Sequence, residues 1–483
     1  MAFAGLRRVS HSPLAVVGLA VGALAAWSWG YEALAGGTVA EAEEAPSAGE
    51  SAARAAAAEP HGGLSADEWE ASDGPRLLRP PRPDERYGLP VAIEGGGSEP
   101  LQHFHQALER AAAGEGQARI LFYGASHVAS DTFTGPLRVA LQQRYGDAGH
   151  GFVLPVHPWR SYRHMGVEIE SNPKRWETLR IRAGASADDV DYYGLAGMAV
   201  ETDRRGAFGE VRTAARGSVT GKASQFEVFY LKQPDGGELD VKIDGRRVGR
   251  IQTAAEAAEP GYATFRVEDG SHALRLEARG NGKVRVFGVA VERERPGVVL
   301  DTLGINGARA RYHLLWEDSL YRQHLVRRDP DLAVLAYGTN ESGDDQPLED
   351  YERELRQVVA RVRETVPQAS CLLIGPSDRP VVLDEGVYED RPRTARLNAI
   401  QRRVAIEHGC GYFDLLAFQG GPLSMVEWAA ADPPYGQADH IHFTIRGYRR
   451  LGDVMLEAFL EGFSAPGDDP AATTASAAGA GGD

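Results

Sequence analysis

The sequence contains very few cysteines and has no excess of positive charge. Two cysteines among 483 residues are too few for a disulfide framework or a cysteine-rich metal site. Asp and Glu number 68 against 52 Lys and Arg, which gives a net charge of -16. Because a protein that binds phosphate backbones needs a basic surface, this balance argues against nucleic acid as the main partner.

The amino terminus lacks charge over an apolar run, residues 9–31, that is long enough to cross a membrane. Arg7 and Arg8 precede this run, and basic residues there keep the start of a chain in the cytoplasm. We therefore expect export to the periplasm or cell envelope. Because Ala33-Leu-Ala35 fits a signal-peptidase site, residues 1–36 are interpreted as a signal peptide or a signal anchor in the inner membrane. Of the two we favour the anchor.

Large apolar side chains are scarce in residues 37–100 and 464–483, which are rich in Ala and Gly. Such segments cannot bury enough surface to offset the entropy lost on ordering. They are interpreted as a disordered linker and a disordered tail, so the folded part is expected to span residues 101–463.

The folded part shows two patterns. In residues 101–155 and 296–463, short apolar runs alternate with helical patterns, which predicts a parallel sheet covered by helices on both faces. In residues 156–295, apolar and polar residues alternate within short segments separated by turn signals, which predicts an inserted β-sandwich. Its expected strands are 226–231, 239–243, 263–267, 273–276 and 284–289.

Ser126 follows one of the apolar runs. Ile120–Tyr123 is typical of a buried parallel strand that stops at Gly124, and a helical pattern with Pro136 in its first turn comes after the serine. Open α/β sheets carry their chemistry between the carboxyl end of a strand and the next helix. Ser126 is therefore a candidate functional residue, and an ordinary serine in a turn is the alternative.

Further candidates follow later segments. Asp439 stands three residues before His442, where a carboxylate can orient the imidazole of a general base. Asp439, His440 and His442 together offer a metal site as the alternative. Asn340 follows the end of an expected strand, where an amide can donate to an oxyanion, although an isolated Asn there commonly satisfies its own turn.

In their order and placement, four segments resemble the blocks of the SGNH (GDSL-type) hydrolase superfamily. They are Gly124-Ala-Ser126-His127, Gly304-Ile-Asn-Gly307-Ala308, Gly338-Thr-Asn340-Glu341 and Asp439-His-Ile-His442-Phe-Thr444. The resemblance implies a flavodoxin-like three-layer α/β/α fold with a parallel sheet, here interrupted by the β-sandwich. It also implies Ser126 as nucleophile, His442 as base and Asp439 as the residue that orients the base.

The same resemblance implies an oxyanion hole made by the backbone N–H groups of Ser126 and Gly307 and the amide of Asn340. It implies no metal and no organic cofactor. The sequence departs from the family at Ala125, where an Asp usually stands before the nucleophile. This change bears on the rigidity of the turn and on full activity.

The inserted sandwich makes the layout similar to exported bacterial peptidoglycan O-acetylesterases, which carry a carbohydrate-binding-like β module within the hydrolase domain. The resemblance implies a serine esterase that removes O-acetyl groups from a cell-envelope glycan such as peptidoglycan through an acyl-enzyme. Two alternatives stay open. One is a glycan O-acetyltransferase with the same triad, and the other is a non-catalytic envelope glycan-binding protein on a decayed hydrolase fold.

The two cysteines open two expected strands. Cys371 begins the run to Ile374, and Cys410 precedes the run Tyr412–Leu415. If these strands are neighbours, both cysteines lie at the sheet edge opposite Ser126, within reach of a disulfide. Export favours a disulfide, whereas a pair of free cysteines packs well as small apolar residues. We favour the free pair.

Overall fold

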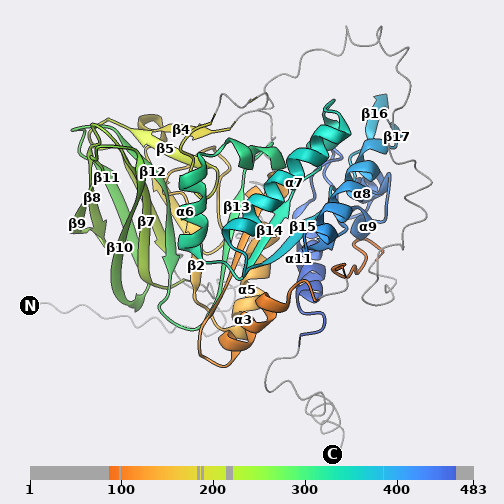
Figure 1. Ribbon diagram of the computed structural model, residues 1–483, viewed down its shortest axis with the longest axis horizontal. Helices are drawn as coiled ribbons and strands as arrows, with labels where there is room; N and C mark the ends of the chain where they lie inside the picture. Colours follow the sequence, from red (N-terminus) through yellow and green to blue (C-terminus); the bar gives the residue numbers. More distant parts are fainter. Residues whose placement is uncertain are drawn as a thin grey trace, which may run out of the picture. The chain divides into compact units, whose positions relative to one another are not determined.

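The structure is a computed structural model that describes residues 86–96, 99–181, 185, 190–213, 221–384 and 386–463 (Figure 1). The expected signal segment 1–36, the tail 464–483 and most of the expected linker lie outside the described residues. No helix within the described ranges is both long and apolar enough to cross a bilayer.

A five-stranded parallel sheet carries the α/β part. Its order is β13 (Gly297–Gly304), β1 (Gln117–Gly124), β14 (Leu332–Ala336), β15 (Ser370–Ile374) and β18 (Gly411–Phe413). Counted along the chain, these strands follow the flavodoxin-like order 2-1-3-4-5. All four pairings are parallel, so the carboxyl ends of the strands meet at one edge. The expected flavodoxin-like fold class is confirmed.

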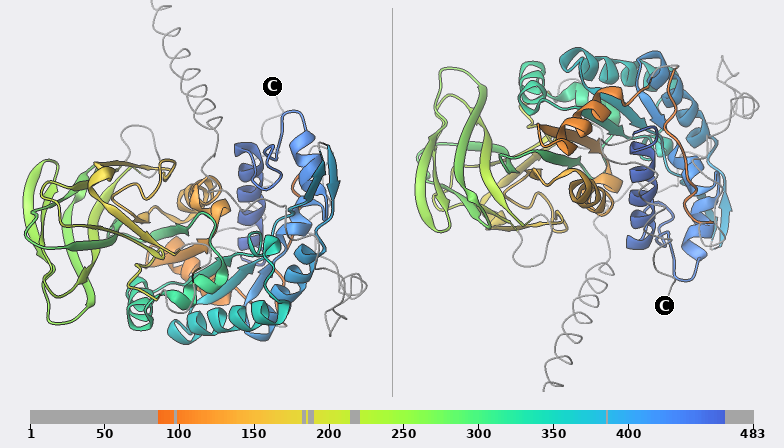
Figure 2. Two further views of the ribbon diagram at one scale, coloured as in Figure 1. Left: turned by 90° about the horizontal axis from the view of Figure 1, so that it is seen from above. Right: turned by 90° about the horizontal axis from the view of Figure 1, so that it is seen from below.

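Helices cover both faces of this sheet (Figure 2). One face packs against α3 (Gln102–Ala112), α5 (Thr134–Tyr145) and α11 (Ile445–Phe459). The other packs against α6 (Asp318–Arg328), α7 (Leu348–Thr365) and α8 (Pro392–Glu407). Side chains of β1 alternate between the two cores, because successive residues of a strand point to opposite faces. Ile120 and Phe122 enter the first core, and Leu121 and Tyr123 the second.

Two antiparallel sheets form the expected β-sandwich, which lies to the left in Figure 1. The first sheet has the order β10 (Glu259–Gly270), β7 (Ala223–Lys232), β12 (Val284–Glu292), β5 (Met198–Thr202) and β4 (Glu177–Arg180), with β2 (Gly149–Val153) also paired to β12. The second has the order β3 (Val167–Ser171), β6 (Phe208–Thr213), β11 (Ala273–Ala278), β8 (Glu238–Ile243) and β9 (Arg246–Gln252). All five strands expected from the sequence are present.

The sandwich and the parallel sheet are joined through β2. The expected boundary after residue 155 follows this strand, yet β2 pairs with β12 of the sandwich, with Val153 opposite Val289. One continuous apolar cluster also runs from the sandwich interior to the α6–α8 face of the parallel sheet. The sandwich therefore shares its core with the α/β part.

Buried charges reinforce this junction. Glu292, at the end of β12, is paired with Arg119 of β1 and lies 2.7 Å from the guanidinium of Arg328 on α6. Burial raises the pKa of Glu292, but Arg328 and Arg119 outweigh it and lower the pKa to about 2. Asp301 of β13 accepts hydrogen bonds from Arg328 Nε at 2.8 Å and from the backbone N–H of Phe152 in β2 at 2.8 Å. Each of these carboxylates thus ties the two parts together.

The folded part begins earlier than expected. Residues 86–96 fall within the expected linker 37–100, but Val91 is fully buried and Glu94 pairs with Tyr412 of β18 through backbone hydrogen bonds of 2.8 and 2.9 Å. This segment covers the edge of the parallel sheet. The composition of this segment does not indicate its order, because that order depends on contacts with residues more than 300 positions away.

Cys371 and Cys410 form a disulfide, with their Cα atoms 4.6 Å apart. The preference for a free pair was wrong, whereas the expected neighbouring strands β15 and β18 are confirmed. Strand β18 ends at Phe413 and not at Leu415, because Asp414 caps a short helix, α9 (Leu415–Gln419), by accepting from the Ala417 N–H.

Candidate active site

The carboxyl ends of three strands bring the expected blocks together. Gly124 at the end of β1 pairs with Gly304 of β13 on one side and with Ala336 of β14 on the other. The N–H of Ile305 donates to the Gly124 carbonyl at 3.0 Å, so the turn after β13 is fixed to the end of β1. The first three blocks therefore meet at one edge of the sheet.

Ser126 begins a one-turn helix, α4 (Ser126–Ala129), directly after β1. The Ala125 carbonyl accepts from the N–H groups of Val128 and Ala129 at 3.1 and 2.9 Å. The turn is therefore closed by backbone bonds although Ala125 offers no side-chain acceptor. Gly124 permits this tight turn, because an added Cβ there would lie 2.3 Å from Val128 Cγ2.

Ser126, His442 and Asp439 form one hydrogen-bonded chain. The Ser126 Oγ lies 2.8 Å from His442 Nε2, and His442 Nδ1 lies 2.6 Å from Asp439 Oδ2. Because an ionised carboxylate only accepts, Nδ1 carries the proton and Nε2 is left to accept from the serine hydroxyl. This is the arrangement that a serine nucleophile and its general base require.

Asp439 is held ionised by its own loop. Its Oδ1 accepts from the backbone N–H groups of Ile441 and His442, both at 2.9 Å. Although partial burial raises its pKa, the bonds from the His442 ring and these N–H groups hold the pKa of Asp439 well below its usual range. The carboxylate therefore stays charged beside the imidazole.

The loop that carries these two residues is fixed on both sides. Gln437 bonds to the carbonyls of His442 and Phe443, through its N–H at 2.8 Å and its side-chain amide at 2.9 Å. After this loop, Thr444 is the N-cap of α11, and its side chain accepts a hydrogen bond from the Gly447 N–H. The loop that carries His442 is therefore held in place by hydrogen bonds on both sides.

His440 does not join His442. Its ring packs against the ring of Tyr388, with centroids 4.6 Å apart, in a hairpin formed by β16 (Val381–Asp384) and β17 (Val387–Glu389). Within the described residues, no group of three or more His, Cys, Asp and Glu side chains is arranged to hold a metal.

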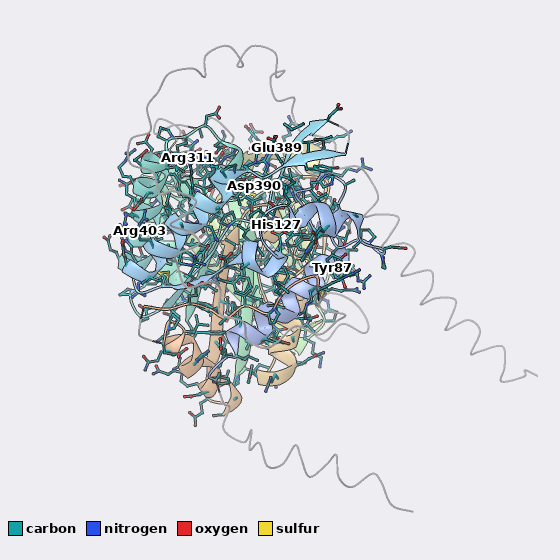
Figure 3. All side chains as sticks on the ribbon, turned by 90° about the vertical axis from the view of Figure 1, so that its right-hand side faces the viewer. Tyr87, His127, Arg311, Glu389, Asp390 and Arg403 are labelled. Atoms are coloured by element: carbon teal, nitrogen blue, oxygen red, sulfur yellow. A yellow bond between two sulfur atoms is a disulfide. The ribbon has the colours of Figure 1, made fainter. Side chains whose placement is uncertain are left out.

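His127, which the sequence placed in the nucleophile block without a role, is buried and follows Ser126 in the chain (labelled in Figure 3). Its Nδ1 is 2.9 Å from the Tyr448 hydroxyl and its Nε2 is 3.0 Å from the Ser377 Oγ. Burial, with His442 nearby, lowers the pKa of His127 to about 3, so the ring is neutral. It joins the nucleophile turn to α11 and to the segment after β15.

Ser377 was missed from the sequence. It follows Gly375-Pro376 at the end of the fourth strand of the sheet, so its position beyond a strand end was the available signal. Its hydroxyl also lies 2.9 Å from that of Thr339, next to Asn340. His127, Ser377 and Thr339 therefore form a polar chain beneath the site.

The expected oxyanion-hole residues lie on the two turns beside Ser126. Gly307 has a φ of +74°, and an added Cβ would meet nothing within 4 Å, so its backbone borders open space. The Asn340 amide donates to the Ala308 carbonyl at 2.9 Å. That bond uses one of its two amide hydrogens and leaves the second as a donor.

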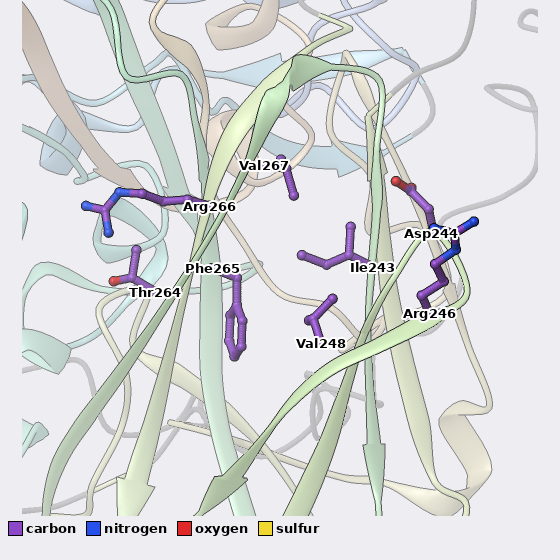
Figure 4. Close-up of a pocket in the computed structure, with 8 residues that line it drawn as sticks. All are labelled: Ile243, Asp244, Arg246, Val248, Thr264, Phe265, Arg266 and Val267. Carbon is purple, nitrogen blue, oxygen red and sulfur yellow. The ribbon is translucent and has the colours of Figure 1, made fainter.

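A separate cavity of about 620 Å³ opens on the sandwich, between β9 and β10 (Figure 4). Its walls include Phe265, Val248, Arg246 and Arg266. None of its lining residues belongs to the loops around Ser126. It is therefore a feature of the sandwich and not of the candidate active site.

Part of the chain matches a known protein family. The sequence model of the GDSL-like Lipase/Acylhydrolase family matches residues 269–450. The chain carries a GDSL-like lipase/acylhydrolase domain. The match contains Gly307, Asn340, Asp439 and His442 but not Ser126, which the inserted sandwich separates from the rest of the GDSL-like domain.

One solved structure is similar over most of its length. A peptidoglycan O-acetylesterase has 24% sequence identity and a TM-score of 0.63, over 76% of this chain and 98% of its own. The two proteins therefore share a fold. No curated protein sequence matches this chain.

Other solved structures are more distant. A family two carbohydrate esterase from Clostridium thermocellum is 10% identical, with a TM-score of 0.26, over 55% of this chain and 95% of its own. An acetyl xylan esterase is 19% identical, with a TM-score of 0.26, over 34% of this chain and 81% of its own. These likenesses are too slight to support a conclusion about function.

Proposed function

We propose that the protein is a serine esterase that removes O-acetyl groups from a cell-envelope glycan such as peptidoglycan. The observation that carries the proposal is the hydrogen-bonded chain from Ser126 through His442 to Asp439. The fold shared with a peptidoglycan O-acetylesterase supports the choice of substrate. The amino-terminal run 9–31 supports export to the periplasm, with anchoring to the inner membrane.

The first half of the reaction forms an acetyl-enzyme. The Ser126 oxygen attacks the ester carbonyl while its proton passes to His442 Nε2. The negative oxygen of the tetrahedral intermediate takes hydrogen bonds from the Ser126 and Gly307 N–H groups and the Asn340 amide. When the ester C–O bond breaks, the His442 proton goes to the departing sugar oxygen, and the acetyl group stays on Ser126.

The second half releases acetate. Water gives its proton to His442 Nε2 and attacks the acetyl carbonyl, and the bond to Ser126 then breaks as the proton returns to the serine oxygen. Asp439 stabilises the imidazolium that forms in each half and keeps the ring oriented. No metal or organic cofactor takes part in these steps.

Ser126→Ala tests the proposal. The variant should abolish acetate release from p-nitrophenyl acetate and from O-acetylated glycan strands, and its melting temperature should stay nearly unchanged because only one hydroxyl is lost. Ser319→Ala is the matched control, since its hydroxyl accepts only a bond from Gln323 on the exposed side of α6. Full activity in Ser126→Ala, or an inactive wild-type protein, would reject the esterase.

We also propose that the inserted sandwich binds the glycan strand. The cavity between β9 and β10 is lined by Phe265, Val248 and Arg246, and such a combination of apolar surface and a few polar groups is typical of ligand sites. Phe265→Ala should reduce co-sedimentation with insoluble glycan while turnover of p-nitrophenyl acetate stays unchanged. Undiminished co-sedimentation would rule out this cavity as the site.

A further inference from the structure

The two turns of the expected oxyanion hole are not joined by the sheet. Strand β1 lies between β13 and β14, so no backbone ladder connects the turn after β13 with the loop after β14. The hole nevertheless needs the N–H of Gly307 and the amide of Asn340 to converge on one oxygen atom. Contacts beyond the strand ends therefore have to fix their relative position.

Asn340 and Glu341 supply two of these contacts. The Asn340 amide donates to the Ala308 carbonyl, as described above. Glu341 is buried, and its carboxylate accepts from the N–H of Ala310 at 2.8 Å and from the N–H of Gly338 at 3.0 Å. Burial raises the pKa of Glu341. Both side chains hold the backbone that follows Gly307, but neither touches Gly307 itself.

Arg309 supplies the third contact and is the one that reaches Gly307. Its Nη1 donates to the Gly307 carbonyl at 2.6 Å. Its Nε and Nη2 donate to the two carboxylate oxygens of Asp344 at 3.0 and 2.6 Å. The guanidinium thus joins the turn after β13 to the loop after β14 through three hydrogen bonds.

This ion pair is partly shielded from water. The side chains of Arg309 and Asp344 are 19% and 27% exposed. The hydrogen bonds to Asp344 raise the pKa of Arg309, so the guanidinium is always charged. A bidentate pair of this kind fixes orientation as well as distance, which a lysine in the same place cannot do.

We propose that Arg309 and Asp344 are a positioning pair that sets the oxyanion hole by fixing the Gly307 turn relative to Asn340. The Ala308 N–H closes the Gly307 turn by donating to the Ile305 carbonyl at 3.1 Å, and Arg309 adds the bond that holds the Gly307 carbonyl relative to the loop after β14. The inference rests on the proposed esterase function. The pair touches no reacting atom and acts only through the two turns.

Kinetics on an uncharged small ester separate positioning from substrate binding. Arg309→Ala should lower kcat for p-nitrophenyl acetate by about 10²-fold, the order expected when a reacting group is misplaced by about 1 Å. KM should change by less than about threefold, because binding of the ground-state ester does not depend on the oxyanion hole. Arg309→Lys and Asp344→Asn should each give a smaller loss in kcat.

Chemical rescue distinguishes a positioning role from a merely structural one, because a small cation would not restore kcat if the substitution had only damaged the structure. Methylguanidinium should restore part of the kcat of Arg309→Ala because it can pair with Asp344 and donate to Gly307, whereas methylammonium should not. Arg322→Ala is the matched control, since Arg322 pairs with Asp318 at 3.0 Å on α6, and its kcat should stay unchanged. Rates are expressed per site titrated with a fluorophosphonate, so that unfolded protein is not counted.

The outcomes are distinguishable. An inactive wild-type protein rejects the proposed function. An active wild type with unchanged kcat in Arg309→Ala rejects the positioning pair and leaves the esterase standing. A loss confined to KM, or a loss that vanishes once rates are expressed per titrated site, also rejects it. Lowered kcat with rescue by methylguanidinium alone supports it.

Discussion

Asn340 has two tasks at the scale of a single residue. It is the expected side-chain donor of the oxyanion hole, and it also holds the Ala308 carbonyl of the neighbouring turn. Asn340→Ala should therefore lower kcat for p-nitrophenyl acetate by roughly 10²- to 10³-fold, as loss of an oxyanion-hole donor does. Steady-state kinetics on the purified variant measure the effect.

Asn172→Ala provides the comparison for that experiment. The side-chain amide of Asn172 also donates to a backbone carbonyl, that of Gly206 at 3.0 Å, but Asn172 lies in the sandwich. Its kcat should equal that of the wild type. If Asn340→Ala retained more than a tenth of wild-type turnover, Asn340 would not be an oxyanion donor.

His324 is a residue whose side chain works against stability. It is fully buried, neither ring nitrogen has a hydrogen-bond partner among the described residues, and its ring packs against those of Phe229 and Phe287. A buried polar group without a partner costs about 1–3 kcal/mol. His324→Leu should raise the free energy of unfolding by about 1 kcal/mol, measured by urea denaturation at pH 7.5. A destabilised variant would show that the packing of the His324 ring contributes more to stability than its two unbonded nitrogens cost.

Among the elements, β15 and β18 are tied together twice, by their ladder and by the disulfide. Cys371 and Cys410 are 39 positions apart, and closing a loop of this size stabilises a protein by about 2–4 kcal/mol through the unfolded state. Cys371→Ala/Cys410→Ala should lose about that much free energy of unfolding and keep its esterase kcat, because the bridge lies at the edge opposite Ser126. Denaturation with and without reductant gives the first value.

Peptide mass spectrometry of unreduced protein checks the bridge itself. Alkylation of both thiols without prior reduction would contradict the disulfide. A drop in kcat of the double variant at temperatures well below its melting point would contradict the separation of the bridge from the site.

The main elements could be predicted because their patterns are local. Ile120–Tyr123 and Ala333–Tyr337 are apolar runs that stop at a glycine, and α11 carries its own cap in Thr444. Segment 86–96 could not be predicted, because its order comes from β18 and not from its own composition. The disulfide was not predicted, because spacing alone does not fix the distance between two strands.

The candidate site divides in the same way. Ser126, Asp439 and His442 were predicted because each follows a strand or precedes a helix with recognisable signals. Arg309 was not predicted, because its importance comes from two partners, Gly307 and Asp344, that only the folded turns bring together. An arginine in a chain with 52 basic residues carries no signal of its own.

For the whole molecule, the sandwich is not a detachable module. Removing Pro155–Pro296 would leave β2 without β12 and would leave Arg328 without Glu292 at a buried position. Arg328 would keep its bonds to Asp301 but would lose its second carboxylate at this buried position. A chain with a short linker in place of these residues should therefore fail to fold, as judged by circular dichroism and size-exclusion chromatography. A soluble, folded and active product would contradict the shared core.

Stability should fall in acid, for reasons spread over the whole molecule. Burial lowers the pKa of His127, His313 and His324 to about 3 and that of His164 to about 4, against about 6.5 in the unfolded chain. Between these values the unfolded state binds more protons, so stability is lost as pH falls below about 6.5. Glu292 contributes a further loss of stability at lower pH, because its pKa of about 2 in the folded protein lies below the value in the unfolded chain.

Urea denaturation at pH 7.5, 6 and 5 measures this dependence. The free energy of unfolding should decrease at each step, and the decrease between pH 6 and 5 should be smaller in His324→Leu, which removes one of the titrating groups. A free energy that stays flat across this range would show that these rings take up protons in the folded state.

The position of β1 in the sheet has a consequence for how the protein is made. Both of its partners come later in the chain: Gln117 pairs with Gly297, 180 positions further on, and Ile120 pairs with Leu332. At a synthesis rate of about 5–20 residues per second, this apolar strand waits roughly 10 to 40 s before its first neighbour leaves the ribosome. During that interval both its edges are free to pair with other chains, so slow translation or high expression should favour aggregation of nascent chains.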